Sequence, residues 1–284
     1  MSDRLSRSWQ LTRASWAVLK QDRQLLLFPL ISSGAAGVVM AAFGLAAFGY
    51  WVADGMSGHP ADRLPLLAYA TGFLFYVTLY FIVFFFNAAL VGAALIRFDG
   101  GTPTLRDGLR VARARIGRIL GYAVIAATVG MLLRAIQERV GFLGRIVVGF
   151  LGAGWTVATF LVVPVLVSRE VGPIDAVKES ALILKKTWGE NVVGQAGMGL
   201  AFVLAHLAVG CVGIACVIAA AVGGHPWLLG SAIVFTVVAE GLLALVHAAL
   251  SGIYAAALYR FAAGGGATGG FDPSTLQAAF AAKR

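Results

Sequence analysis

The sequence predicts an all-α protein, a polytopic transmembrane helical bundle with six spans. Apolar residues make up 60% of the chain and charged residues only 12%, whereas soluble domains carry about 25% charged residues. Six apolar stretches reach the roughly 20 residues that a spanning helix needs. Lysine and arginine are concentrated in alternate connecting segments. We therefore expect a single membrane domain over residues 1–284.

The six expected spans are separated by charged or turn-forming segments. The third is short. The fourth contains Pro164, which we expect to kink its helix and to free a backbone carbonyl that neighbouring helices must satisfy. A tight turn at residues 223–226 separates the last two. The expected spans cover residues 25–53, 66–98, 119–136, 142–168, 192–222 and 227–259.

The distribution of basic residues predicts the orientation of these spans, because segments rich in lysine and arginine stay on the cytoplasmic side of a membrane. Five basic residues precede the first span, six lie between the second and third, four between the fourth and fifth, and three follow the sixth. Only four lie on the opposite side. We therefore expect both termini in the cytoplasm. The hairpin around Arg134 and Arg145 is basic although it falls outside, which leaves open a re-entrant pair of helices and a count of four spans.

The connecting segments divide the chain into three similar units. Residues 1–24, 99–118 and 169–190 precede the span pairs 25–98, 119–168 and 191–260, and residues 261–284 form a cytoplasmic tail. Each connecting segment carries apolar residues at helical spacing, which predicts three amphipathic helices on the same side. These stripes are Leu5, Trp9, Trp16 and Leu19, then Leu105, Leu109, Ala112 and Ile116, then Ile174, Val177, Ala181, Leu184 and Trp188. Residues Ser274 to Phe280 resemble a short fourth copy.

Two interpretations of the amphipathic helices remain open. They can lie in the membrane interface, or they can form a cytoplasmic cap packed on the ends of the spans. In both cases we expect their basic side chains to meet anionic headgroups. The candidate residues are Arg106, Arg110, Arg113, Arg115, Arg118, Lys185 and Lys186. Their common side favours a parallel 2+2+2 repeat over the inverted 3+3 repeat of many transporters.

A few polar residues fall at membrane depth, where charge is costly and often functional. Glu240 and His206 lie at similar heights in the last hairpin, and His247 lies on the same helix face as Glu240. Asn87 and Ser251 lie level with each other, nearer the cytoplasmic end. One hypothesis is a proton-titratable polar track inside the bundle. The other is a hydrogen-bonded clamp between the last two helices.

Motifs that carry catalysis or metal binding do not occur in this sequence. It has no HExxH zinc motif, no Gly-x-Ser-x-Gly nucleophile motif and no phosphate-binding loop. We therefore expect no enzymatic activity, no catalytic residue, no metal and no cofactor. The basic loops account for the net charge of +9, so we expect membrane lipids as partners and no nucleic acid. A protein partner or a second copy of the chain stays open.

Several short stretches of the sequence form a recognisable combination. They are SWAVLK at 15–20 and LLLFPL at 25–30, VGMLLR at 129–134, VPVLV at 163–167, Gly172-Pro173, Lys178-Glu179-Ser180 and TWGE at 187–190. Together they resemble an uncharacterised family of prokaryotic six-helix membrane proteins, a domain of unknown function. The resemblance covers nearly the whole chain and implies a six-span bundle in a prokaryotic inner membrane. The chain is also distantly similar to the membrane domain fused to some glycerophosphodiester phosphodiesterases.

These observations support three hypotheses for function. The first is a non-enzymatic membrane protein that organises lipids or partner proteins through its amphipathic segments. The alternative is a transporter or channel for a small or amphipathic solute, with Glu240 and His206 in the path. The third, a lipid-modifying enzyme, follows only from the distant similarity to the phosphodiesterase-associated domain.

Overall fold

A computed structural model describes residues 2–57, 65–186, 191–224 and 226–264, and the side chains within these ranges except those of 2–11, 51, 53–57, 65–68, 186 and 191–197. Every regular element in the described ranges is helical. Six helices among them are long and apolar enough to cross a membrane. The predicted all-α bundle with six membrane-capable helices is therefore confirmed. The proposed fourth repeat in the tail and Trp188 lie outside the described residues.

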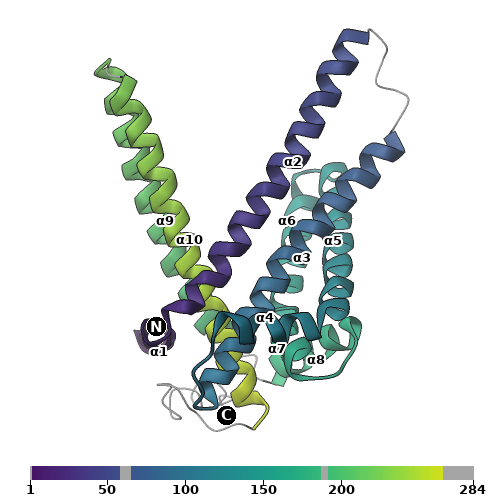
Figure 1. The fold of residues 1–284 in the computed structure, drawn as a ribbon, viewed down its shortest axis with the longest axis vertical. Coiled ribbons are helices and arrows are strands. Elements are labelled where there is room, and N and C mark those ends of the chain that lie inside the picture. The colour runs from purple at the N-terminus through teal and green to yellow at the C-terminus, as the bar shows by residue number, and fades with distance from the viewer. Residues whose placement is uncertain (1, 58–64, 187–190, 225, 265–284) are drawn as a thin grey trace.

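The helices form three hairpins, each preceded by a helix at one shared end of the molecule (Figure 1). The first unit is α1 (Ser2–Gln21), a 3₁₀ turn (Arg23–Leu26), α2 (Leu27–Ser57) and α3 (Pro65–Phe98). The second is α4 (Leu105–Ala114), α5 (Ile116–Arg139), α6 (Phe142–Ala158) and α7 (Val162–Ser168). The third is α8 (Pro173–Lys186), α9 (Asn191–Val222) and α10 (Pro226–Ala262).

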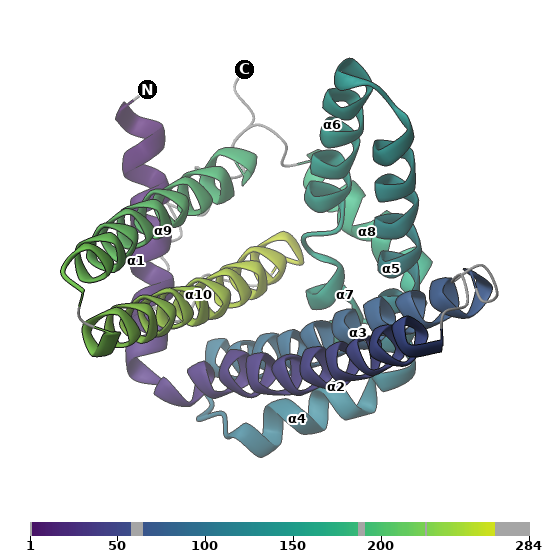
Figure 2. The ribbon, with the colours of Figure 1, turned by 90° about the horizontal axis from the view of Figure 1, so that it is seen from above.

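The molecule has a packed base and three diverging arms. The base is the end of the molecule that contains α1, α4, α7 and α8 together with the adjoining ends of α2, α3 and α10. The arms are the remaining lengths of the α2–α3, α5–α6 and α9–α10 hairpins. The arms spread away from one another above the base, as the view from above also shows (Figure 2). Because α1, α4 and α8 all lie in the base, the structure has the parallel arrangement that the sequence predicts.

Close helix contacts hold the base together, and α3 lies at its centre against α2, α4, α5, α7 and α10. The α3–α4 contact depends on two glycines. A Cβ atom on Gly108 of α4 would lie 2.6 Å from the carbonyl oxygen of Ala89 and 2.5 Å from the ring of Phe28. A Cβ on Gly92 of α3 would lie 2.8 Å from Val111. Only glycine therefore lets α4 lie this close to α3.

Ion pairs join the elements of the base to one another. Arg97 of α3 pairs with Asp22 after α1 at 3.0 Å, and Arg260 of α10 pairs with Asp99 after α3. In the second unit, Arg115 pairs with Glu170 at 2.7 Å and Arg169 with Glu179 at 2.8 Å. These side chains are partly exposed, so each pair contributes modestly to stability. Together they place a layer of charge at this end of the bundle.

The fourth predicted span is interrupted rather than kinked. Helix α6 ends at Ala158, α7 begins at Val162, and Pro164 follows in the first turn of α7, where its missing N–H costs little. The fully buried Ser180 of α8 bridges the break, since its hydroxyl donates to the carbonyl of Ala158 at 2.7 Å and accepts from the N–H of Leu161 at 3.1 Å. A neighbouring helix therefore satisfies freed backbone groups of the fourth span, as the sequence predicts. It does so at a complete break between α6 and α7 and not at a kink.

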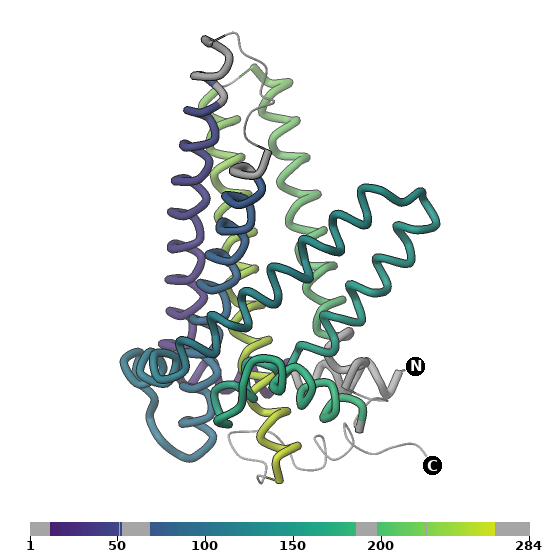
Figure 3. The backbone as a smooth tube through the Cα atoms, turned by 90° about the vertical axis from the view of Figure 1, so that its right-hand side faces the viewer, coloured from purple at the N-terminus to yellow at the C-terminus, as the bar shows by residue number. Residues whose placement is uncertain are grey.

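Other sequence expectations need correction. The third span is not short, because α5 has 24 residues; its arm leans away from the other two (Figure 3). Ile116 begins α5 and is 48% exposed instead of joining the α4 stripe. The predicted stripe of α8 is correct in part. Leu184 is buried and Val177 packs against the core, but Ile174 is 60% exposed. Ala176 and Ser180 are also buried, and Ser180 bonds across the break between α6 and α7.

The basic hairpin that did not fit the predicted orientation contacts α3 through Arg134. Arg134 of α5 donates to Glu138 at 3.1 Å and to the hydroxyl of Tyr76 on α3 at 2.8 Å. The arginine therefore also ties the α5 arm to α3.

Candidate functional site: a polar pocket between the arms

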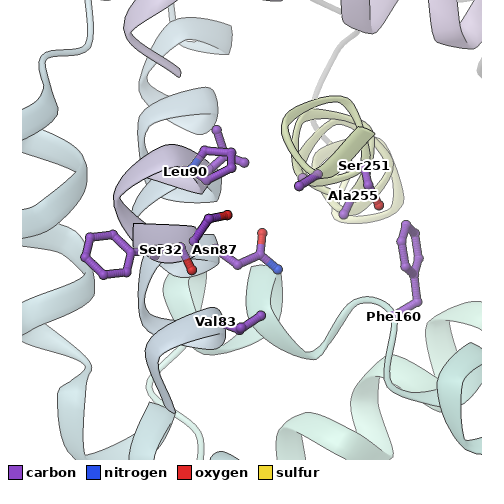
Figure 4. Close-up of a pocket in the computed structure, with 12 residues that line it drawn as sticks. Ser32, Val83, Asn87, Leu90, Phe160, Ser251 and Ala255 are labelled. Carbon is purple, nitrogen blue, oxygen red and sulfur yellow. The ribbon is translucent and has the colours of Figure 1, made fainter. Parts of the chain in front are cut away.

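A pocket of about 330 Å³ lies where the α2–α3 and α9–α10 arms separate. Its walls come from three spans and from the break between α6 and α7, which contributes Phe160 (Figure 4). Ser32 of α2, Asn87 of α3 and Ser251 of α10 are labelled there among the lining side chains. The remaining lining residues are Pro29, Ser33, Val83, Phe86, Leu90, Ala248, Gly252 and Ala255.

The pocket marks the boundary between base and arms on all three helices. Ser32 is the last buried residue in the described part of α2, continuous burial of α3 begins at Ala88, and that of α10 begins at Ala249. The floor is closed by buried residues such as Leu90 and Gly252, while Val83 at the mouth is 47% exposed. The pocket is therefore closed toward the base and open toward the space between the arms.

The polar side chains of the pocket have unused hydrogen-bonding capacity. Among the described residues, the side chains of Ser32, Asn87 and Ser251 make no hydrogen bond, although Thr78, Thr128 and Ser231 elsewhere in the spans each bond to a carbonyl of their own helix. An amide and hydroxyls offer both donors and acceptors. No charged residue lines the pocket. The arrangement suits an uncharged polar group rather than a phosphate or a metal ion.

Glu240 and His206, the central pair of the predicted polar track, meet in the α9–α10 arm. Nδ1 of His206 and Oε2 of Glu240 are hydrogen bonded, and the two side chains are 33% and 31% exposed. The helices approach closely beside them, since a Cβ on Gly213 of α9 would lie 2.3 Å from Thr236 of α10. The pair joins two adjacent helices, as a clamp would, and it does not line the pocket.

The predicted polar residues do not line one cavity. The ring of His247 stacks on Phe202 of α9, with centroids 4.3 Å apart and an interplanar angle of 9°. Asn87 and Ser251 line the pocket instead. In the described part of the chain, no three histidine, cysteine, aspartate or glutamate side chains are grouped so that they could hold a metal ion. The polar track is therefore divided among a hydrogen-bonded pair, a stacked ring and the pocket.

The predicted basic residues also divide into two groups. Arg106, Arg110 and Arg113 are exposed along one face of α4, whose opposite face buries Gly108 and Ala112. Arg115 and Arg118 instead turn toward the α7–α8 connection: Arg115 pairs with Glu170, and Arg118 donates to the carbonyl of Arg169 at 3.4 Å. Lys185 is exposed on α8, and the side chain of Lys186 lies outside the described residues.

A capping box fixes the start of the arginine-bearing helix. The side chain of Thr104 accepts from the N–H of Asp107 at 3.3 Å, and the Asp107 carboxylate accepts from the N–H of Thr104 at 3.1 Å. The hydrogen bonds from Thr104, aided by the charge of Arg110, lower the pKa of Asp107 below its ordinary value. The acidic first turn also matches the positive end of the helix dipole.

Sequence reasoning found two of the polar pocket residues and missed the others. Asn87 and Ser251 were recognised as polar positions at similar depth. Ser32 and Ser33 are adjacent polar residues inside the first apolar stretch, and such a pair indicates a polar position within that span. Phe160 could not be placed at the pocket without the break between α6 and α7 that exposes it.

No curated protein matches the chain. A family model described as a family of unknown function, DUF6159, matches residues 66–270, which is more than half of the chain and runs from the start of α3 through α10. The chain therefore belongs to the DUF6159 family of unknown function.

Proposed function

We propose that this protein is a non-enzymatic integral protein of a prokaryotic inner membrane that gathers anionic lipids around its cytoplasmic side. In this proposal both termini are cytoplasmic, as the distribution of basic residues favours. The observation that carries it is the α4 surface. Arg106, Arg110 and Arg113 point away from a buried glycine-containing face that fixes the helix against α3.

The height of α4 supports contact between these arginines and lipid headgroups. Gly108 packs on Ala89, so α4 is level with the point where continuous burial of α3 begins at Ala88. Above the base, the 226–248 segment of α10 spans roughly 35 Å at about 1.5 Å per residue, enough for a hydrocarbon core of about 30 Å. The boundary of the hydrocarbon then falls close to α4.

The test is the lipid composition around the protein in nanodiscs of mixed phosphatidylglycerol and phosphatidylcholine. The variant R106Q/R110Q/R113Q should lose enrichment of phosphatidylglycerol, because each basic residue near an anionic surface contributes about 1 kcal/mol. A control variant, R139Q/R145Q, changes exposed arginines at the opposite end of the α5–α6 arm. Equal enrichment in wild type and the triple variant would rule out the proposal.

A transporter or channel is the second candidate, and the Glu240–His206 contact is the observation that favours it. Glu240 lies nine residues above the start of burial in α10 at Ala249, or about 14 Å along the helix. A titratable pair near the middle of a membrane is suited to accept and release a proton. Under this candidate, E240Q abolishes proton-linked flux in liposomes, and unchanged flux excludes it. The lipid-modifying enzyme has no support beyond the distant similarity.

A further inference from the structure

We propose that the pocket between the arms binds the glycerol ester end of an acylglycerol, with the acyl chains leaving through the open mouth into the bilayer. The inference goes beyond the lipid-gathering function of α4 and does not depend on it, because no arginine lines the pocket. It rests on three properties of the pocket: its depth, its lining and the direction in which it opens.

The depth of the pocket matches the level at which glycerol esters lie. Gly92 and Ala89 of α3 contact α4, and Asn87 lies just above them on the same helix. The polar side chains therefore lie within about one to two helical turns of the arginine-bearing helix. In a leaflet, the ester groups occupy this zone between charged headgroups and acyl chains.

The lining matches the chemistry of an uncharged polar group on an aliphatic body. Asn87 supplies an N–H₂ donor and a carbonyl acceptor, and Ser32 and Ser251 supply hydroxyls, none of which bonds within the described chain. Phe86 and Phe160 supply apolar walls. Sites for small molecules have volumes of about 300–1,000 Å³ and combine a mainly apolar lining with a few polar groups. The pocket is large enough for the polar end of a lipid but not for its chains.

An unsatisfied hydroxyl beside the pocket supports the same conclusion. The hydroxyl of Tyr254 is fully buried and has no hydrogen-bond partner in the described residues. Its ring packs on Phe160, a lining residue, at 6.1 Å, and it lies three residues after Ser251. Buried polar groups normally have a hydrogen-bond partner. This region therefore has more hydrogen-bonding groups than the chain itself satisfies.

The direction in which the pocket opens gives the acyl chains of the ligand a path into the bilayer. On α10 none of residues 226–248 with a described side chain is buried, and on α2 none after Ser32 with a described side chain is buried. Both walls above the pocket are apolar helices exposed to the bilayer. A lipid can therefore enter sideways from its own leaflet without its chains leaving hydrocarbon.

The experiment measures binding of radiolabelled dioleoylglycerol to the full-length protein in phosphatidylcholine nanodiscs. We expect one molecule per chain, and N87L and S251V should each weaken binding roughly tenfold, the effect of losing one hydrogen bond to the ligand. S231V is the matched control, since Ser231 lies on the α10 arm away from the pocket. Two variants are used so that the test still stands if one of them fails to fold. Thermal unfolding in detergent shows whether each variant is folded.

Competition between ligands shows which polar group the pocket binds, a glycerol ester or a carboxylate. Unlabelled dioleoylglycerol should displace the label, whereas oleic acid, which carries a charged carboxylate, should not. Displacement by oleic acid alone, or binding unchanged in both N87L and S251V, would overturn the proposal. R106Q/R110Q/R113Q should bind dioleoylglycerol as wild type does, so failure of the arginine proposal and failure of this one give different results.

Discussion

The two halves of α10 are both apolar but have different surroundings. Residues 249–259 are almost entirely buried in the core of the base, while residues 226–248 contain no buried residue. Both halves are apolar, since the whole helix qualifies as a candidate span. The comparison shows that apolarity alone does not create a core in a membrane protein. Lipid is as apolar as leucine, so packing depends on small residues and polar contacts.

The base therefore depends on steric fit, and the largest effect should come from breaking it. We expect Gly108→Leu to destabilise the protein by about 1–3 kcal/mol or more, because the added side chain collides with the carbonyl of Ala89 and the ring of Phe28. Thermal unfolding in detergent measures the loss.

The matched control for the base is a glycine in an arm. A Cβ on Gly44 of α2 meets nothing within 4 Å, so Gly44→Leu should be neutral or slightly stabilising through its higher helix propensity. Equal destabilisation by the two substitutions would contradict the division into base and arms.

The next largest effect should come from the hydroxyl that joins α8 to the broken span. We expect Ser180→Ala to cost about 1–3 kcal/mol, because it leaves the carbonyl of Ala158 and the N–H of Leu161 unsatisfied in a buried place. Ser231→Ala in the α10 arm removes a bond to the carbonyl of Leu228 on its own helix and should change the unfolding midpoint little. Similar midpoints for both variants would show that the break needs no cap.

A smaller effect should follow from removing the polar link within an arm. We expect Glu240→Leu to weaken α9–α10 association by about 0.6 kcal/mol, the average for interhelical hydrogen bonds in membranes. Glu240→Gln, which can still bond to His206, should cost less. Hydrogen exchange should rise in the arm for Glu240→Leu and stay unchanged in residues 249–259. Increased exchange in the base would show that the arm and the base unfold together.

The sequence predicted the arms better than the base. The spans, the hairpins and the shared side of the amphipathic helices follow from hydropathy and charge, because these two properties largely determine which segments cross a bilayer and in which direction. The burial of Ser180 on α8 does not, because its hydroxyl bonds across a break between α6 and α7 that hydropathy does not predict. Asn87 of α3 is predicted as a polar residue level with Ser251, but its separation from Glu240 of α10 depends on how far the arms diverge, and spacing along one helix cannot show that.

The smallest expected effect concerns the acidic cap of α4, which fixes the arginine-bearing surface on the base. Since folding lowers the pKa of Asp107 below its ordinary value, the carboxylate stabilises the helix start above the unfolded pKa, and this contribution is lost as the pH falls through the lower folded pKa. Hydrogen exchange in α4, corrected for intrinsic rates, should therefore rise below about pH 4 and stay flat from pH 5 to 8. Asp107→Asn, which keeps a polar group but does not titrate, should remove the acid-dependent rise, whereas an unchanged rise would place the titrating group elsewhere.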